Sequence, residues 1–304
     1  MLPVTPASSG SCLSTAADAE GFSRAASNPG SMEVGIVAQQ DNDRAAALAG
    51  RLRDRLRDLD VGVAVDETTA DRLSLPGVPV AELAARDLAV SIGGDGTFLF
   101  AARNADGTPI IGVNLGEVGF LNAVGPGEAV EVVADAVAAY RRDDLAVRSV
   151  PRIAASHDGW TGDPAMNEIV VHGARRGHGG GVDAEIRVDG STYDATHVDG
   201  VLVATPTGST AYNLSERGPL VHPSVDGLIV NQMAASDGMP PLVVGPDSEV
   251  AVSVSGAETA VVVGDGRNRR RLSPPATVTV ARADSPVRLA GPQADFFEAL
   301  GKLD

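Results

Sequence analysis

Residues 88–97 read LAVSIGGDGT, a short apolar run that passes directly into a glycine-rich turn. The run from Leu88 to Ile92 predicts a buried strand, and a helix is expected to begin near Phe98. Three glycines in four positions allow a sharp turn and leave the backbone open to a ligand. A helix after such a turn directs unpaired N–H groups and the positive end of its dipole at the ligand, so the pattern is typical of a phosphate site.

The sequence on both sides of this turn alternates apolar runs with amphipathic segments. We expect strands at residues 33–38, 61–65, 88–92 and 109–114, and helices at residues 43–59 and 129–141. This alternation predicts a Rossmann-like parallel α/β sheet in a first domain over residues 32–147.

The pattern changes from Arg148 onward, where short β-rich runs are divided by Gly, Asp and Pro. The runs lie at residues 169–172, 184–188, 196–204, 249–254, 259–263 and 277–280. They predict an all-β second domain over residues 148–285. An amphipathic segment at residues 294–303 is expected in a C-terminal piece, residues 286–304, that packs back on the first domain.

The N-terminal residues 1–31 are rich in Ser, Ala, Pro and Gly and have no periodic apolar pattern, which predicts a disordered tail or a true start at Met32. They resemble no signal peptide, and no apolar run approaches the roughly 20 residues that span a bilayer. The single cysteine, Cys12, cannot form an internal disulfide. We therefore expect a cytoplasmic protein without a membrane partner.

The charge of the chain bears on its partners and its surroundings. A formal charge of −16 excludes the basic surface that nucleic-acid binding needs. Lys302 is the only lysine, and acidic residues are abundant. This composition predicts the high-salt cytoplasm of a halophilic archaeon, where salt screens the repulsion among carboxylates, although a GC-rich genome is an alternative explanation.

Asp95 is the residue of the glycine-rich turn that indicates chemistry. A carboxylate repels a phosphate unless it binds a metal or accepts a proton, and we expect Asp95 to take the proton of an attacking hydroxyl. A positioned base of this kind contributes roughly 100-fold to 10,000-fold in rate. The alternative is an aspartate that only caps the helix at Phe98.

The turn resembles the Gly-Gly-Asp-Gly-Thr signature shared by the NAD kinases, the diacylglycerol and sphingosine kinases and, in looser form, the phosphofructokinases. Residues 199–212, DGVLVATPTGSTAY, resolve the substrate. They form an apolar run before a turn rich in hydroxyls (Thr205, Thr207, Ser209, Thr210), and Tyr212 adds a face on which a base can stack. This segment resembles the diagnostic segment of NAD kinases, which lipid kinases are expected to lack, and residues 218–223, GPLVHP, continue the match.

Two further motifs resemble the same family. Asn167 and Glu168 match its Asn-Glu pair, in which an amide suits the N6 and N7 edge of adenine and a carboxylate suits ribose hydroxyls. Residues 112–121, GVNLGEVGFL, match its Gly-x-Asn-x-Gly-x-x-Gly-Phe-Leu stretch. Asn114 is expected at the C-terminal end of a strand, where α/β sheets bind ligands, whereas Phe120 and Leu121 are expected to anchor the loop in the core.

The resemblance to NAD kinases implies transfer of a phosphoryl group from ATP, another nucleoside triphosphate or polyphosphate to the 2′-hydroxyl of the adenosine ribose of NAD. It implies Asp95 as the base and an NAD site of Gly96, Asn167, Glu168, His197, Asp199, Thr207, Thr210, Ala211 and Tyr212. It implies donor contacts from Gly93, Gly94, Thr97 and Asn114. Mg²⁺ is expected to bridge the donor phosphates without a dedicated protein metal site. A homodimer or homotetramer is also implied.

The sequence departs from the family pattern at two places. Residues 231–241, NQMAASDGMPP, lack the His and Arg that the family usually carries there, and His197 stands where many members have Arg. Arg175, Arg176 and His178 are alternative countercharges, although a solvated basic loop is the other interpretation. A diacylglycerol-type lipid kinase and a dinucleotide-binding paralogue without activity are the rival functions.

Overall fold

The glycine-rich turn follows a central strand of a six-stranded sheet whose order is β2-β1-β3-β4-β18-β5. In a computed structural model, residues 32–116, 119–175, 177, 179–235 and 237–301 are described. The sheet consists of β1 (Glu33–Ala38), β2 (Gly62–Val65), β3 (Leu88–Gly93), β4 (Ile110–Asn114), β5 (Val147–Val150) and β18 (Val287–Ala290). All its strand pairs are parallel except β18 with β5. The predictions for residues 1–31, Arg176, His178 and Lys302 lie outside the described residues.

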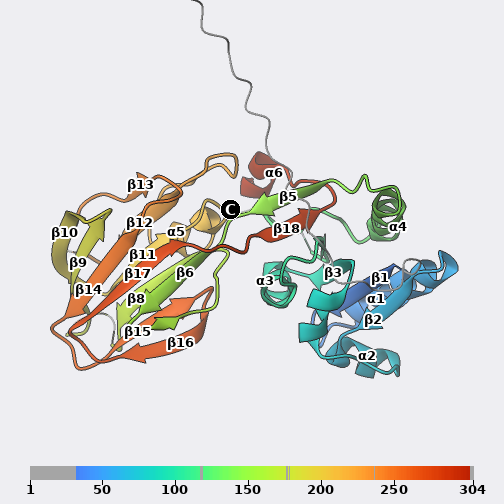
Figure 1. Cartoon of the computed structure of the whole chain (residues 1–304), viewed down its shortest axis with the longest axis horizontal. Helices are drawn as coiled ribbons and strands as arrows, with labels where there is room; N and C mark the ends of the chain where they lie inside the picture. Colours follow the sequence, from blue (N-terminus) through green and yellow to red (C-terminus); the bar gives the residue numbers. More distant parts are fainter. Residues whose placement is uncertain (1–31, 117–118, 176, 178, 236, 302–304) are drawn as a thin grey trace, which may run out of the picture. The chain divides into compact units, whose positions relative to one another are not determined.

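Helices cover both faces of this sheet, because alternate residues of its strands point to opposite faces and nearly all are apolar. One apolar core joins the sheet to α1 (Asp43–Asp58) and α4 (Ala129–Tyr140). A second core on the other face joins it to η1 (Val80–Ala85) and α3 (Asp95–Asn104). The helix α2 (Glu67–Leu73) follows β2 (Figure 1). The predicted Rossmann-like parallel sheet is confirmed.

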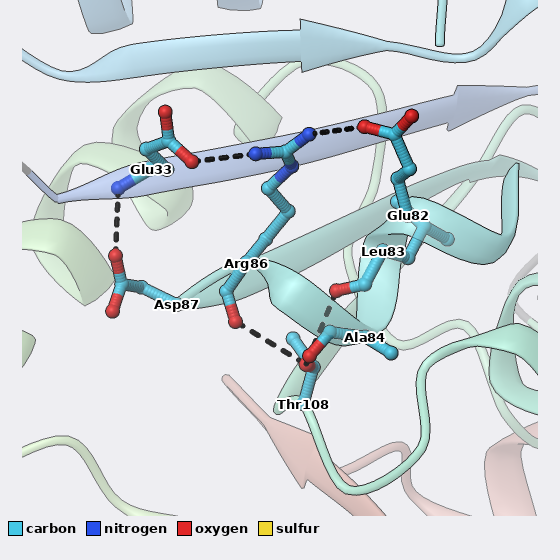
Figure 2. A network of polar contacts seen from close by, with 7 residues as sticks. All are labelled: Glu33, Glu82, Leu83, Ala84, Arg86, Asp87 and Thr108. Atoms are coloured by element: carbon cyan, nitrogen blue, oxygen red, sulfur yellow. Dashed lines mark hydrogen bonds and ion pairs between the residues drawn. The ribbon is translucent and has the colours of Figure 1, made fainter. Parts of the chain in front are cut away.

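Polar contacts fix the N-terminal ends of β1 and β3, the edge of the sheet away from the turn. Arg86 bridges Glu33 at 2.6 Å and Glu82 at 2.9 Å, and Asp87 accepts from the backbone N–H of Glu33 at 2.8 Å (Figure 2). The Thr108 hydroxyl lies within hydrogen-bond distance of the carbonyls of residues 83, 84 and 86 and shares its one hydrogen among them, which ties η1 to the segment before β4. The network fixes the end of the sheet opposite to the glycine-rich turn.

The second half forms two antiparallel sheets that share one apolar core. The first has the order β10-β9-β14-β17-β6-β7 and the second β13-β12-β11-β8-β15-β16. The strands are β6 (Ile153–His157), β7 (Trp160–Thr161), β8 (Glu168–Gly173), β9 (Val182–Val188), β10 (Ser191–Val198), β11 (Gly200–Ala204), β12 (Leu228–Met233), β13 (Leu242–Val244), β14 (Val250–Ser255), β15 (Ala260–Gly264), β16 (Arg267–Leu272) and β17 (Ala276–Arg282).

Short helices complete the chain. A 3-10 turn, η2 (Thr207–Thr210), and α5 (Tyr212–Ser215) follow β11, and α6 (Phe296–Leu300) follows β18. Strand β18 places the C-terminal piece in the first sheet, as predicted, and the ring of Phe296 lies 5.8 Å from that of Phe120. The division into domains at residues 147 and 285 stays a prediction. None of the described helices is long and apolar enough to cross a membrane.

Two element predictions need correction. Helix α3 begins at Asp95 rather than near Phe98, because the Gly94 carbonyl already accepts from the N–H groups of Thr97 and Phe98. Residues 196–204 are two strands rather than one. The chain leaves β10 in one sheet and enters β11 in the other at Asp199, a change of sheet that an apolar run does not reveal.

Candidate active site

The ends of β3 and β4 bring two of the predicted motifs together. In the register of these parallel strands, Gly93 is the partner of Asn114. Gly93 is packed tightly, since an added Cβ would lie 2.5 Å from the Thr97 hydroxyl. Asn114 is buried, and its side-chain oxygen accepts from the N–H of Gly116 at 3.1 Å. The predicted donor contacts Gly93, Gly94, Thr97 and Asn114 therefore lie at one sheet edge, where open α/β sheets bind ligands.

Asp95 is the first residue of α3, but it does not cap the helix. The N-cap is Gly94, and no side chain makes a capping bond there. The Asp95 carboxylate instead accepts from Asn122 Nδ2 at 3.2 Å and from the backbone N–H groups of Leu121 and Phe120. Burial raises the pKa of Asp95 above its usual value, and these hydrogen bonds partly oppose the rise. A half-buried carboxylate with fixed donors is suited to receive a proton.

The loop opposite Asp95 approaches it closely. An added Cβ on Gly119 would lie 2.6 Å from Asp95 Oδ1 and 3.3 Å from Asn114 Nδ2. Glycine is therefore required here for space. Leu121 belongs to the core, as expected, and half-buried Phe120 packs on Phe296. These two apolar residues also serve the site through their backbones.

Asn167 and Glu168 form a tight corner at the start of β8. Thr205 donates from its hydroxyl to the Met166 carbonyl at 2.6 Å and from its N–H to the Asn167 carbonyl at 2.9 Å. The Glu168 carboxylate is buried and accepts from the backbone N–H of Tyr212. The corner thus joins the Asn-Glu pair to the hydroxyl-rich segment, two of the motifs found in the sequence.

The residues of the hydroxyl-rich turn differ in their burial and in their hydrogen bonds. Thr205 and Ser209 are fully buried and donate to backbone carbonyls of residues 166 and 221, so they hold the turn rather than a ligand. Thr207, Thr210, Ala211 and Tyr212 are half-buried. The Thr210 hydroxyl donates to the Thr207 carbonyl at 3.3 Å. The predicted ligands of the turn are therefore its more accessible residues.

A small cavity of about 30 Å³ lies between this turn and the loop that bonds to Asp95. Its lining includes Thr207 and Thr210 on one side and Phe120 and Leu121 on the other. Arg148 of β5 also lines it and is half-buried. Burial lowers the pKa of Arg148, and within the described part of the chain no carboxylate forms an ion pair with it. An unpaired cation in a cavity favours an anionic ligand.

Two of the predicted NAD ligands, His197 and Asp199, lie apart from the motifs described above. His197 is exposed and bonds to Asp183 at 2.8 Å and to the Gly180 carbonyl at 2.9 Å, and the Asp183 bond raises its pKa. It lines a cavity of about 740 Å³ in which no other predicted ligand takes part. Asp199 accepts from the N–H of Gly177 at 2.9 Å, so its carboxylate anchors the Gly-rich loop that contains exposed Arg175.

The segment without His and Arg is held by amide side chains. Asn231 is buried and donates to Asn213 Oδ1 and to the Glu216 carbonyl, and Gln232 donates to Asp194 at 2.7 Å. The residue at 236 lies outside the described residues. Amides thus supply the anchoring of this segment, but they add no countercharge.

Sequence reasoning missed three residues of the site. Asn122 is fully buried and donates to Asp95, Asp265 accepts from the backbone of the Asn-Glu corner, and Arg148 lines the cavity. Asn122 directly follows the matched residues 112–121, so its position was a signal. Asp265 stands 98 positions from Asn167 and could be found only from the fold.

Glu168 predicts a pH dependence of stability. Burial first, and then the charge of Asp265, raise the pKa of Glu168 to about 7 from 4.5. The folded state therefore holds this proton at pH values where the unfolded state has lost it. The stabilisation is fully present below about pH 4.5 and is lost as pH rises through about 7, with an upper limit of roughly 3 kcal/mol.

Glu168→Gln tests this dependence, because glutamine keeps the size of the side chain and cannot ionise. We expect the free energy of unfolding of the variant, relative to wild type, to rise by about 2 kcal/mol between about pH 5 and about pH 8.5. Denaturant titrations at both pH values measure it. Glu258→Gln, at an exposed position, is the matched control and should show no such change. Parallel curves for Glu168→Gln and wild type would contradict the assignment.

Comparison with known proteins agrees with the motifs. Residues 34–141 match the family described as ATP-NAD kinase N-terminal domain, and residues 166–291 match ATP-NAD kinase C-terminal domain. The NAD kinase of Halorubrum lacusprofundi is 58% identical over 274 residues, which cover 90% of this chain and all of that protein. The NAD kinase of Haloarcula marismortui is 58% identical over 282 residues with the same coverage. Both organisms are halophilic archaea.

Solved structures of low identity share the fold. A structure described as an NAD kinase from Archaeoglobus fulgidus in complex with ATP has a TM-score of 0.72 and 27% identity, and the match covers 89% of this chain and 97% of that one. A yeast NADH kinase complexed with NADH has a TM-score of 0.80 and 22% identity, with 90% and 87% covered. The second likeness shows the fold alone.

Proposed function

The chain belongs to the NAD kinase family, and on that premise we propose how its residues transfer a phosphoryl group to NAD. The product is NADP, phosphorylated on the 2′-hydroxyl of the adenosine ribose. The observation that carries the proposal is that Phe120 and Leu121 adjoin both Asp95 and the hydroxyl-rich turn. Their N–H groups donate to Asp95, and their side chains line the cavity that also contains Thr207 and Thr210. The cavity of about 30 Å³ is too small to hold a ribose, but it shows that the hydroxyl-rich turn adjoins the loop that bonds to Asp95.

In this proposal Asn167 and Glu168 hold the adenosine, and Thr207, Thr210, Ala211 and Tyr212 form the adjoining wall. The Asp95 carboxylate accepts the proton of the 2′-hydroxyl as the oxygen attacks the terminal phosphorus of the donor. The bond from that phosphorus to the leaving oxygen breaks, and the leaving nucleoside diphosphate keeps the electron pair. Asn122 donates to one carboxylate oxygen and helps to hold the base in place.

ATP is the donor that we propose, since the Archaeoglobus relative is described in complex with it. Gly93, Gly94 and Thr97 would present backbone and hydroxyl groups to its phosphates at the start of α3. Mg²⁺ takes one or two protein oxygens and otherwise phosphates and water. Asn114 offers a side-chain oxygen at this edge, and the donor phosphates and water would supply the other ligands of such an ion, which would neutralise charge on the phosphates.

The donor and metal are tested by assaying NADP formation from NAD with ATP or with polyphosphate, in concentrated potassium chloride. We expect ATP with Mg²⁺ to support formation and excess chelator to abolish it. Equal rates with the chelator present would exclude the metal, and formation with polyphosphate alone would replace ATP as the donor. Light scattering on the same sample measures the homo-oligomeric state, which stays a prediction together with the cytoplasmic location.

Arg148 supplies countercharge to the phosphates of one substrate in this proposal. Replacing Arg148 with Gln should raise the KM for NAD or for ATP about tenfold, the loss expected for one charge-assisted hydrogen bond. Steady-state kinetics that vary each substrate measure which one is affected. Arg142→Gln removes an exposed charge six residues earlier in the chain and is the control. Unchanged KM values in Arg148→Gln would assign that cation a purely structural role.

A further inference from the structure

We propose that Asp265 is a positioning residue that shapes the Asn167–Glu168 corner to receive the adenosine ribose of NAD. The inference rests on the proposed function, because it takes Asn167 and Glu168 to be nucleotide ligands. Asp265 lies in the turn between β15 and β16 and matches none of the motifs found in the sequence.

The carboxylate of Asp265 collects the N–H groups of three consecutive residues. Oδ2 accepts from Met166 at 2.9 Å, and Oδ1 accepts from Asn167 at 2.8 Å and from Glu168 at 3.3 Å. The N–H of Asp265 in turn donates to the Glu168 carbonyl at 3.0 Å. Charge-assisted bonds of this kind are stronger than neutral ones, so one side chain determines the direction of three peptide units.

The remaining carbonyls of the corner are bonded from the other side. Thr205 donates to the carbonyls of Met166 and Asn167 through its hydroxyl and its N–H. Every backbone polar group of residues 166–168 therefore has a protein partner, and none of these bonds uses the side chain of Asn167 or Glu168. The backbone of the corner is fixed without using either side chain, and among the described residues the Glu168 carboxylate has only the N–H of Tyr212 as its own backbone partner.

The charge of Asp265 has a cost at this place, which argues for a specific role. Its carboxylate lies close enough to help raise the pKa of Glu168, a like charge in a buried site. Arg103 of α3 and Arg152 lie near enough for their charges to interact with Asp265 and offset part of that cost. Arg103 lies in the last turn of α3, the helix that begins at Asp95, so the charge of Asp265 also interacts with this helix.

A plain turn residue is the competing explanation. Asp265 and Gly266 both have positive φ, 45° and 68°, which is the geometry of an Asp-Gly hairpin turn. Asn adopts this conformation as readily as Asp. Asp265→Asn therefore preserves the turn and removes the charge and one acceptor oxygen, so the variant separates the two explanations.

The test measures NAD binding by calorimetry without a donor, followed by steady-state kinetics. We expect Asp265→Asn to weaken the Kd for NAD about tenfold, to raise the KM for NAD in parallel and to leave the KM for ATP and kcat within about threefold. Loss of stability alone would lower the active fraction and leave the Kd unchanged. Asp163→Asn is the matched control, because Asp163 also interacts with the charge of Arg103 but is exposed and bonds to Asn268.

The outcomes separate the inference from its premise. If Asn167→Ala binds NAD as tightly as wild type, the ligand assignment fails and the inference fails with it. If Asn167→Ala weakens binding and Asp265→Asn does not, only the inference is overturned. Should Asp265→Asn fail to fold, Asp265→Glu decides, since it keeps the charge and displaces the acceptor. A Kd equal to that of wild type in Asp265→Glu would then overturn the inference.

Discussion

Replacing Asp95 with Asn should lower kcat for NADP formation by roughly 100-fold to 10,000-fold while the Kd for NAD changes by no more than a few-fold. The amide keeps the size of the side chain and can still contact Asn122, but it cannot accept the proton of the ribose hydroxyl. Rapid-quench kinetics at saturating NAD and ATP measure the chemical step, and calorimetry measures the Kd. Asp135 lies at an exposed position on α4, and Asp135→Asn is the control for the loss of one negative charge.

The pH dependence of the rate of NADP formation also tests Asp95 as the base. Because burial raises the pKa of Asp95, the base ionises at a higher pH than an exposed aspartate does. The rate of NADP formation should therefore fall as pH decreases through that raised pKa. The residual activity of Asp95→Asn should not show this fall. Full activity in the variant would exclude Asp95 as the base.

Replacing Gly208 with Ala should remove NAD binding through a purely steric effect. An added Cβ would lie 2.1 Å from the Asn167 carbonyl oxygen and 2.5 Å from its carbon, and neither atom belongs to a flexible side chain. The hydroxyl-rich turn and the Asn167–Glu168 corner must then move apart. Overpacking of this kind costs about 1–3 kcal/mol in stability, and a shift of about 1 Å in ligand positions can cost about 100-fold in activity.

The measurement for Gly208→Ala is the Kd for NAD together with the midpoint of thermal unfolding. Gly127→Ala is the matched control, because an added Cβ there meets no atom within 4 Å and the backbone has no positive φ. Binding equal to wild type in Gly208→Ala would mean that the turn and the corner are not in tight contact in solution.

The sequence predicted the elements whose signals are local. The apolar runs of β1 to β4 and the periodicity of α1 predicted these four strands and their helix, whereas β5 and β18 of the same sheet were not predicted. The residues at the ends of β3 and β4 were predicted as ligands. The start of α3 was missed because its N-cap, Gly94, has no side chain that would mark a helix N-terminus in the sequence. Its backbone carbonyl nevertheless accepts the first hydrogen bonds of the helix. Strand β16 was missed because its first five residues are exposed and four of them are Arg, so no apolar alternation marks it.

Long-range relations account for the rest. Asp265 reaches Asn167 only because β15 pairs with β8, and Asn122 reaches Asp95 because the loop after β4 folds back over α3. Thr205 and Ser209 contribute hydroxyls to the motif but were not predicted as ligands. Both are consumed by backbone carbonyls, which local sequence cannot reveal.

The most direct test of the central claim is the position of the phosphate that the purified chain transfers to NAD. Phosphorus NMR of the product from NAD, ATP and Mg²⁺ in concentrated potassium chloride should show one new phosphomonoester on the 2′-oxygen of the adenosine ribose. The product should also serve a strictly NADP-dependent dehydrogenase. A chain that binds NAD yet leaves it unphosphorylated, or one that phosphorylates diacylglycerol instead, would contradict the account.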